Sequence, residues 1–210
     1  MRQDSVAHMP NVVVTRVRYS GPRQSRNLYE HLMVRFPGAW RALVALGLRL
    51  FGPRSRLRRA MLCREIVSGW DAAWRRDYEL MLVRYARDVE LQYDSDFEAI
   101  GLGGTFHGHD GVVRFLDSWG EPWEGWQLLP AAVLDLGDRF LALAHVRLPG
   151  STSGVELESE FAQLATVRDG LVTRDQEFRS WDKGLRSAGL DPDGLPLPRP
   201  GKPQGASRIG

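Results

Sequence analysis

The chain has 210 residues, of which 43% are apolar, with seven Trp and eight Phe. This size and composition are typical of one globular domain with appendages and exclude a fibrous or wholly disordered protein. The net charge is only +2, but residues 1–64 hold 13 arginines against Asp4 and Glu30, whereas the rest of the chain holds 15 basic and 24 acidic residues. A basic arm therefore precedes an acidic domain.

The single cysteine, Cys63, excludes an internal disulfide and a metal cluster of several cysteines. No run of residues reaches the ~18 apolar positions that a membrane-spanning helix needs. Residues 1–10 are too polar for a signal peptide. We therefore expect a cytoplasmic protein.

Residues 1–56 are predicted to form a basic arm with one amphipathic helix at about residues 28–51, and residues 1–26 to be mostly disordered. Apolar side chains recur through this helix at Trp40, Leu43, Val44, Leu48 and Phe51. Three interpretations stay open: the helix packs on the next domain or is loosely attached, it makes weak contact with a membrane surface, or translation starts later, near Met61. Nucleic-acid binding is not expected, because the basic cluster at residues 54–59 belongs to no reading module.

Residues 57–190 are predicted to form the main domain, which starts with two helices. In the first, apolar residues repeat every four positions, as an amphipathic helix requires. They are Leu62, Ile66, Trp70 and Trp74. Asp77 is a suitable cap for a second helix at Tyr78–Ala86. The alternation of Val89–Tyr93 then predicts a strand.

A glycine-rich turn separates this strand from a third helix, for which Asp110 is the predicted N-cap. The rest of the domain is predicted to contain four strands. They are Trp126–Leu136, Arg139–Leu148, Val155–Val167 and Leu171–Trp181. Residues 182–189 are expected to form a closing helical turn, and residues 191–210, with five prolines, a disordered tail. This order predicts an α+β fold, a mostly antiparallel sheet with three helices on one face.

A series of short motifs resembles the SnoaL-like members of the nuclear transport factor 2-like superfamily over roughly residues 58–190. The motifs are Trp74-Arg75-Arg76-Asp77, Tyr85-Ala86-Arg87-Asp88-Val89-Glu90, Gly104-Thr105-Phe106-His107-Gly108-His109-Asp110-Gly111, Leu136-Gly137-Asp138-Arg139, Val167-Arg168-Asp169-Gly170 and Ala188-Gly189-Leu190. The resemblance implies a cone-shaped, curved sheet wrapped on a long helix, with an apolar cavity at its wide end, and a homodimer. The superfamily spans isomerases, epoxide hydrolases, dehydratases, polyketide cyclases and non-enzymatic binders, so the fold does not settle the function.

The resemblance also bears on individual positions. Where the ketosteroid isomerases carry their proton-shuttling carboxylate, their tyrosine and their second carboxylic acid, this chain carries Tyr93, Gly69 and Gln163. Steroid isomerase activity is therefore not expected. SnoaL-type cyclases place an acid/base carboxylate toward the end of the sheet, where Asp175 and Glu177 are the nearest candidates.

Alternate residues of a strand share a face, so an inward Tyr93 predicts which side chains line the cavity. The predicted lining comprises Leu141, Leu143, His145, Phe161, Gln163, Ala165, Val167, Asp175, Glu177 and Arg179. We expect His145 and Glu177 to form a catalytic pair, because a carboxylate beside an imidazole raises its pKa and makes it a general base. Tyr93 would donate a hydrogen bond to the substrate. The alternative is a buried histidine satisfied by a carboxylate, without turnover.

Further ligand contacts are expected from Gln163, Leu143, Phe161, His107, Trp119 and Arg179. Trp119, Trp123 and Trp126 would stack a planar ligand or pack the core. His107 and His109 would be able to hold a metal ion from the glycine turn. No metal is expected, because the His-x-His-x-Asp-His series of hydrolytic sites is not present and Asp110 is better used as a helix cap.

Together these features predict an apolar cavity that binds a small hydrophobic oxygenated molecule. It would support acid/base chemistry without a cofactor, of the isomerase, dehydratase, cyclase or hydrolase type. The alternative is a non-catalytic ligand-binding or dimerising interaction module, and the sequence leaves open whether the protein is an enzyme.

Overall fold

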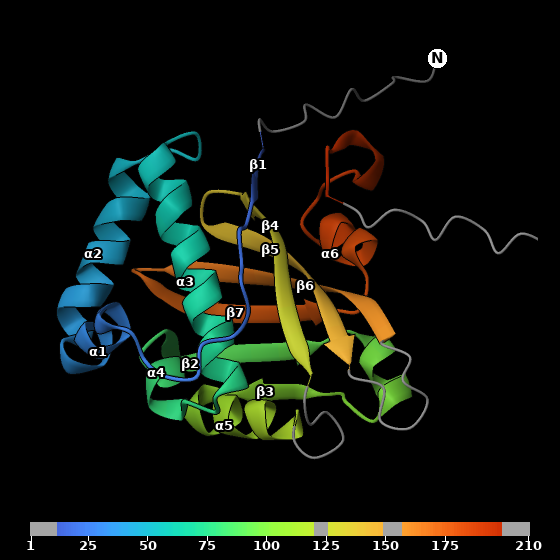
Figure 1. The fold of residues 1–210 in the computed structure, drawn as a ribbon, viewed down its shortest axis with the longest axis horizontal. Coiled ribbons are helices and arrows are strands. Elements are labelled where there is room, and N and C mark those ends of the chain that lie inside the picture. Colours follow the sequence, from blue (N-terminus) through green and yellow to red (C-terminus); the bar gives the residue numbers. More distant parts are fainter. Residues whose placement is uncertain (1–11, 120–125, 149–156, 199–210) are drawn as a thin grey trace, which may run out of the picture.

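The computed structural model describes residues 12–119, 126–148 and 157–198. These residues build a curved seven-stranded sheet in the order β1-β4-β5-β6-β7-β2-β3 (Figure 1). All neighbouring strands are antiparallel except β2 and β7, which are parallel. The strands are β1 Val13–Arg16, β2 Tyr85–Tyr93, β3 Thr105–His107, β4 Gln127–Asp135, β5 Arg139–Leu148, β6 Leu157–Arg168 and β7 Leu171–Phe178.

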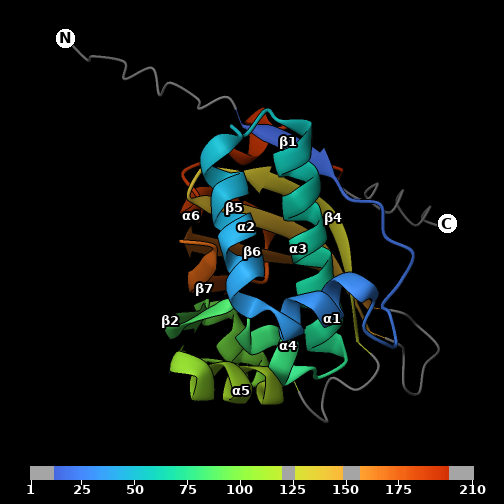
Figure 2. The same ribbon diagram turned by 90° about the vertical axis from the view of Figure 1, so that its left-hand side faces the viewer.

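Helices cover both faces of this sheet. They are α1 Leu28–Arg35, α2 Pro37–Leu50, α3 Arg56–Trp74, α4 Tyr78–Leu82, α5 Gly108–Ser118 and α6 Trp181–Ser187. Helices α1, α2 and α3 lie together on one side of the molecule (Figure 2), whereas α6 packs on β5, β6 and β7 from the other. No helix in the described part of the chain is both long enough and apolar enough to span a membrane.

The hydrophobic core has one part on each face of the sheet, and β5 contributes to both. Ala142 and Ala144 belong to the part beneath α3, whereas Leu141 and Leu143 belong to the part beneath α6. We call these two sides the cavity face and the α6 face. The predicted α+β fold with a curved, mostly antiparallel sheet and an N-terminal helical extension is confirmed.

The N-terminal residues differ from expectation in two ways. The predicted helix at residues 28–51 is divided in two, because α1 begins with a capping box at Asn27 and Pro37 starts α2. The predicted disorder is not seen over residues 12–26, since the apolar Val13–Arg16 segment pairs with the edge of β4. Residues 1–11 lie outside the described residues.

Three smaller corrections concern the main domain and its end. The predicted helix at Tyr78–Ala86 ends at Leu82, because Tyr85 already belongs to β2. Asp110 is not the N-cap of α5; the helix begins at Gly108 after an extended His107, so Asp110 lies in the first turn. After α6, a short 3-10 helix, Pro192–Gly194, replaces the start of the predicted tail, and Leu195 and Leu197 pack against the α6 core. The division into arm, domain and tail stays a prediction.

Candidate functional site

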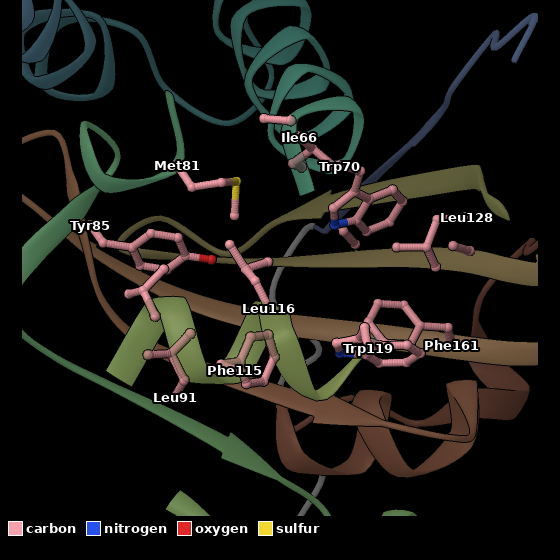
Figure 3. Close-up of a cluster of buried hydrophobic side chains, with 14 of the residues drawn as sticks. Ile66, Trp70, Met81, Tyr85, Leu91, Phe115, Leu116, Trp119, Leu128 and Phe161 are labelled. Carbon is pink, nitrogen blue, oxygen red and sulfur yellow. The ribbon is translucent and has the colours of Figure 1, made fainter. Parts of the chain in front are cut away.

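A cavity of about 500 Å³ lies between the cavity face of the sheet and helices α3, α4 and α5. Apolar side chains form a large part of its wall, as Figure 3 shows for several of them. The apolar wall includes Trp70, Met81, Leu116, Trp119, Leu128 and Phe161. On β5, the small alanines face the helices and the leucines face α6. Arg76, Tyr85, Gln163 and Glu177 supply polar groups to the same cavity.

Two of these polar groups, Gln163 and Tyr85, belong to a chain of hydrogen bonds that runs from α3 across the cavity face of the sheet to β2. The indole N–H of Trp70 donates to Gln163 Oε1 at 2.8 Å, and Gln163 Nε2 donates to Asp175 Oδ2 at 2.7 Å. The Tyr85 hydroxyl donates to the same Asp175 oxygen at 2.8 Å. Burial, together with the Asp175 charge, raises the pKa of Tyr85 well above its usual value, so the phenol stays a donor. The arrangement holds Asp175 as a hydrogen-bond acceptor.

Glu177 lies two residues further along β7, on the same face as Asp175, and is only 4% exposed. It stands opposite Gln163 on β6 and Tyr93 on β2. Burial and then the charge of Asp175 raise the pKa of Glu177 well above its usual value. Its Oε2 atom has no hydrogen-bond partner among the described residues. Burial and the neighbouring charge therefore both favour the protonated form of Glu177.

Asp175 differs from its neighbour although it is equally buried. Burial raises its pKa to about 6, but the hydrogen bonds from Tyr85 and Gln163 oppose this shift. Because two close carboxyl groups cannot both ionise easily, the charge of Asp175 favours the protonated form of Glu177, and Asp175 is the member that loses its proton first. Such a pair can supply a proton at the cavity and stabilise the charged state of one carboxylate.

Beyond this network lies a second, smaller cavity of about 80 Å³, which Asp175, Tyr85 and Gln163 also line. Helix α2 helps to close it, through Trp40, Val44 and Leu48. It also contains Glu65, whose pKa burial raises to about 7 against the opposing charge of Arg84. The hydrogen-bonded network thus separates an outer cavity from an inner one.

Four of the side chains predicted for the site line the outer cavity: Glu177, Gln163, Phe161 and Trp119. Tyr93 lies behind the wall. Its ring stacks on Phe115 with centroids 4.7 Å apart, and its hydroxyl is 2.8 Å from Ser118 Oγ. Burial, followed by the Glu177 charge, raises its pKa. Tyr93 supports the wall and is not placed to touch a ligand.

The predicted pair of His145 and Glu177 is not formed. Ala144 pairs with Phe161 across β5 and β6, so His145 points to the α6 face together with Leu143. There the imidazole Nδ1 is 3.4 Å from Glu158 Oε1, and the ring lies 4.7 Å from the Trp181 ring. The prediction was wrong by one residue in β5, and such a shift moves every side chain of the strand to the other face.

Two other predicted ligand contacts are also remote from the cavity. His107 is exposed on β3, and Arg179 donates to the Asp96 carbonyl at 3.3 Å. His109 Nε2 lies 3.1 Å from the Tyr85 carbonyl. No cluster of three metal-ligating side chains occurs in the described part of the chain. Trp126 lines the cavity beside Trp119, with ring centroids 5.2 Å apart, whereas Trp123 lies outside the described residues.

Sequence reasoning missed Trp70 and Tyr85 as polar members of the site. Trp70 was assigned to the core by its helical spacing, and Tyr85 to a helix. The bulge between Tyr85 and Glu90 in the pairing of β2 with β7 places the phenol against Asp175. The family motif at residues 85–90 was the signal that could have found it.

Comparisons with known proteins agree with this architecture. A family model described as a SnoaL-like domain matches residues 67–175. No curated protein gives a significant match.

Solved structures also resemble the chain. An NTF2-like protein of unknown function from Burkholderia pseudomallei is 24% identical, covers 59% of this chain and 93% of its own, and has a TM-score of 0.48. TerC, crystallised with polyporic acid, is 26% identical; the match covers 60% of this chain and 96% of TerC, with a TM-score of 0.49. A SnoaL-like protein from Jannaschia, described as a polyketide cyclase by similarity, is 16% identical, with 61% and 90% coverage and a TM-score of 0.47.

Proposed function

Because this chain belongs to the SnoaL-like domain family, whose model matches residues 67–175, we propose that its outer cavity binds a small hydrophobic oxygenated molecule. Glu177 acts there as a general acid, in cofactor-independent chemistry of the isomerase, dehydratase, cyclase or hydrolase type. The observation that carries the proposal is a buried carboxyl group whose pKa is raised, in the wall of a cavity lined by aromatic and aliphatic side chains and a few polar ones. Pockets of this composition are typical of small-molecule sites.

The carboxyl groups have separate roles. The Glu177 O–H donates a proton to a carbonyl or hydroxyl oxygen of the ligand. Asp175 does not touch the ligand in the outer cavity; its charge, held by the hydrogen bonds of Tyr85 and Gln163, keeps the proton on Glu177 until the ligand takes it. Asp175 is thus a positioning residue.

After donation, the Glu177 carboxylate lies beside the Asp175 carboxylate, and their repulsion favours rapid reprotonation. In an isomerisation or cyclisation the proton comes from a carbon of the ligand, so the enzyme returns to its starting state. In a dehydration the oxygen leaves as water, and the proton lost from the neighbouring carbon balances the one supplied. None of these reactions consumes a cofactor.

Aromatic side chains at the cavity favour a flat ligand. Trp119 and Trp126 meet at the cavity, and Trp70 contacts Phe161 edge to face with centroids 6.0 Å apart. Indole and phenyl faces bind planar apolar rings through stacking and area burial. We therefore propose cyclic ketones, enols and phenols as the substrate class.

The test compares wild type with E177Q, which keeps the shape of the side chain but has no acidic proton. Cyclic ketones and phenols that bind the native state will raise the melting temperature of both proteins. For a ligand that wild type converts, turnover by E177Q should fall by about 10²–10⁴-fold. The matched control is E98Q, which changes an exposed glutamate and should leave turnover unchanged.

Full turnover by E177Q would refute the assigned role. Ligands that bind wild type without any conversion would instead identify a non-catalytic binding protein. If no compound of this class raises the melting temperature, the cavity has another role, such as dimer packing. A homodimer, as the family resemblance implies, is part of the proposal, and analytical ultracentrifugation tests it.

A further inference from the structure

All the large apolar side chains that are exposed in the described part of the chain lie on α1, α2, the residues that follow them and the start of α3. They are Leu28, Leu32, Phe36, Leu43, Leu46, Leu50, Phe51 and Leu57. On α2, Leu43, Leu46 and Leu50 follow one another at helical spacing and are 63%, 52% and 66% exposed. Together they form a continuous apolar ridge along the outer side of the helix.

The ridge belongs to a helix that is already anchored on its other side. Trp40 and Val44 are buried, and the Trp40 indole N–H donates to the Tyr29 hydroxyl at 2.9 Å. Gly47 faces Met61 so closely that a Cβ atom would lie 2.8 Å from its sulfur. Helix α2 therefore has two apolar sides, and packing on α3 and the sheet uses only one of them.

The exposed charges that α1, α2 and the start of α3 carry are all positive, and one of them, Arg49, pairs with Asp169 of the turn between β6 and β7. Between residues 28 and 64 the sequence contains eight arginines, and Glu30, the one acidic residue there, is fully buried. Arg35, Arg41, Arg54 and Arg56 are exposed and form no ion pair with an acidic residue that the structure describes. Beside α1, Arg16, Arg18, Arg23 and Arg64 line a surface pocket of about 560 Å³. Helices α1, α2 and α3 present this region on one side of the molecule (Figure 2).

We propose that this surface, formed by α1, α2 and the start of α3, docks on an anionic lipid membrane. The leucines of the ridge enter the boundary between headgroups and acyl chains, and the arginines contact lipid phosphates. A second copy of the chain fits less well, because a symmetric dimer through this surface would bring two sets of arginines together. A nucleic acid would leave the leucines without a partner. The proposal is independent of the chemistry assigned to Glu177.

Co-sedimentation of the full chain with vesicles tests the proposal. Vesicles of phosphatidylglycerol and phosphatidylcholine in equal parts should bind the protein, vesicles of phosphatidylcholine alone should bind it more weakly, and added salt should reduce the difference. The triple variant L43E/L46E/L50E should lower partitioning by at least about tenfold. The double variant R54E/R56E should lower it by about tenfold, through lost attraction to anionic headgroups.

The matched control is R87E/R114E, which makes the same change of charge at exposed positions on β2 and α5. If the proposed surface is specific, R87E/R114E should partition close to wild type. If it partitions within about twofold of R54E/R56E, only the net charge matters, and the proposal is overturned. Absence of binding by wild type would also overturn it. If wild type does not bind vesicles but forms a dimer without lipid, and L43E/L46E/L50E is monomeric, the ridge serves self-association instead. All changed side chains are exposed, so melting temperatures should stay near that of wild type, and R54E/R56E decides the outcome if the leucine variant does not fold.

Discussion

Asp175 and Glu177 show how two buried carboxyl groups on one strand acquire different protonation states. Asp175 accepts hydrogen bonds from Tyr85 and Gln163, each of which stabilises the carboxylate. Each of the two carboxyl groups has one oxygen without a partner among the described residues, but the pKa of Glu177 is also raised by a negative neighbour and is lowered by no hydrogen bond. Hydrogen bonding therefore decides which residue gives up its proton first, because burial is nearly the same for both.

This difference predicts how D175N changes the pH dependence of stability. Burial raises the pKa of folded Asp175 to about 6 from 3.8, so the folded protein binds this proton more tightly than the unfolded chain does. Stability is therefore lost as the pH rises from about 4 to about 6, by a contribution on the order of 2–3 kcal/mol. In D175N this loss should be absent, and the raised pKa of Glu177 should fall because its negative neighbour is gone.

Urea unfolding of wild type and D175N at a series of pH values measures the effect. The free energy of unfolding of D175N, relative to wild type, should increase from acidic to neutral pH. D88N removes an exposed carboxylate from the neighbouring strand and should follow the wild-type curve. Parallel curves for wild type and D175N would contradict the assigned pKa of Asp175.

At the scale of elements, one buried ion pair ties the helical extension to the sheet. The Arg58 guanidinium, in the first turn of α3, contacts both oxygens of Asp135 at the end of β4, at 2.5 and 2.7 Å. It also donates to the carbonyls of Leu48, Phe51 and Gly137. A single side chain thus satisfies backbone acceptors of α2, the following turn and the sheet.

Substitution R58M should cost on the order of 3–5 kcal/mol of stability, because it leaves the Asp135 carboxylate buried without its partner. R49M breaks the ion pair of Arg49 with Asp169, whose side chains are 72% and 67% exposed, and should cost less than about 1 kcal/mol. Urea unfolding of the two variants measures the contrast. Equal effects would show that the Arg58 pair contributes no more than a surface contact.

The helices and strands of the main domain could be predicted because their patterns are long. The expected strand Arg139–Leu148 matches β5, and the four-residue repeat ending at Trp74 matches the end of α3. Short β1 and β3 could not be found, since only pairing with β4 and β2 makes them strands. Which face of β5 points toward the cavity could not be predicted either, because leucine and alanine alternate along this strand and both of its faces are buried.

At the scale of the whole molecule, helix α2 is attached to the SnoaL-like domain in part through the turn between β6 and β7. The hairpin turn at Gly170 contacts α2 so closely that a Cβ atom there would lie 2.4 Å from the Arg41 carbonyl oxygen. Gly170 also has a φ of +80°. The turn between β6 and β7 is therefore a contact point for a helix more than a hundred residues earlier in the chain.

G170A should destabilise the protein through two effects, the positive φ and the collision with α2. G137A is the matched control, because Gly137 has a φ of +95° but nothing within 4 Å of the added Cβ. G137A should cost about 1 kcal/mol, and G170A about 1–3 kcal/mol more, through overpacking. Thermal or urea unfolding measures both. Equal losses would mean that α2 is loosely attached and gives way.

The candidate site could be predicted only in part, because it depends on contacts between distant elements. The parity of β6 and β7 brought Gln163, Asp175 and Glu177 to the cavity face, as the period of a strand predicts. The partner of these groups is Tyr85, from a strand that pairs in parallel with β7 after a bulge. Bulges and parallel pairings leave no local signal, and His145 was predicted wrongly because β5 has its other face toward the cavity.

The position of β1 at the edge of the sheet has a consequence for how the protein folds. Val13 pairs with Asp135, so the contact closes a loop of about 120 residues. Closing so long a loop is entropically costly, and β4 has to be in place before β1 has anything to pair with. During synthesis β1 leaves the ribosome long before β4 does and has to wait unpaired. We therefore expect this strand to dock last, so that it completes the sheet after β4 and β5 have already formed.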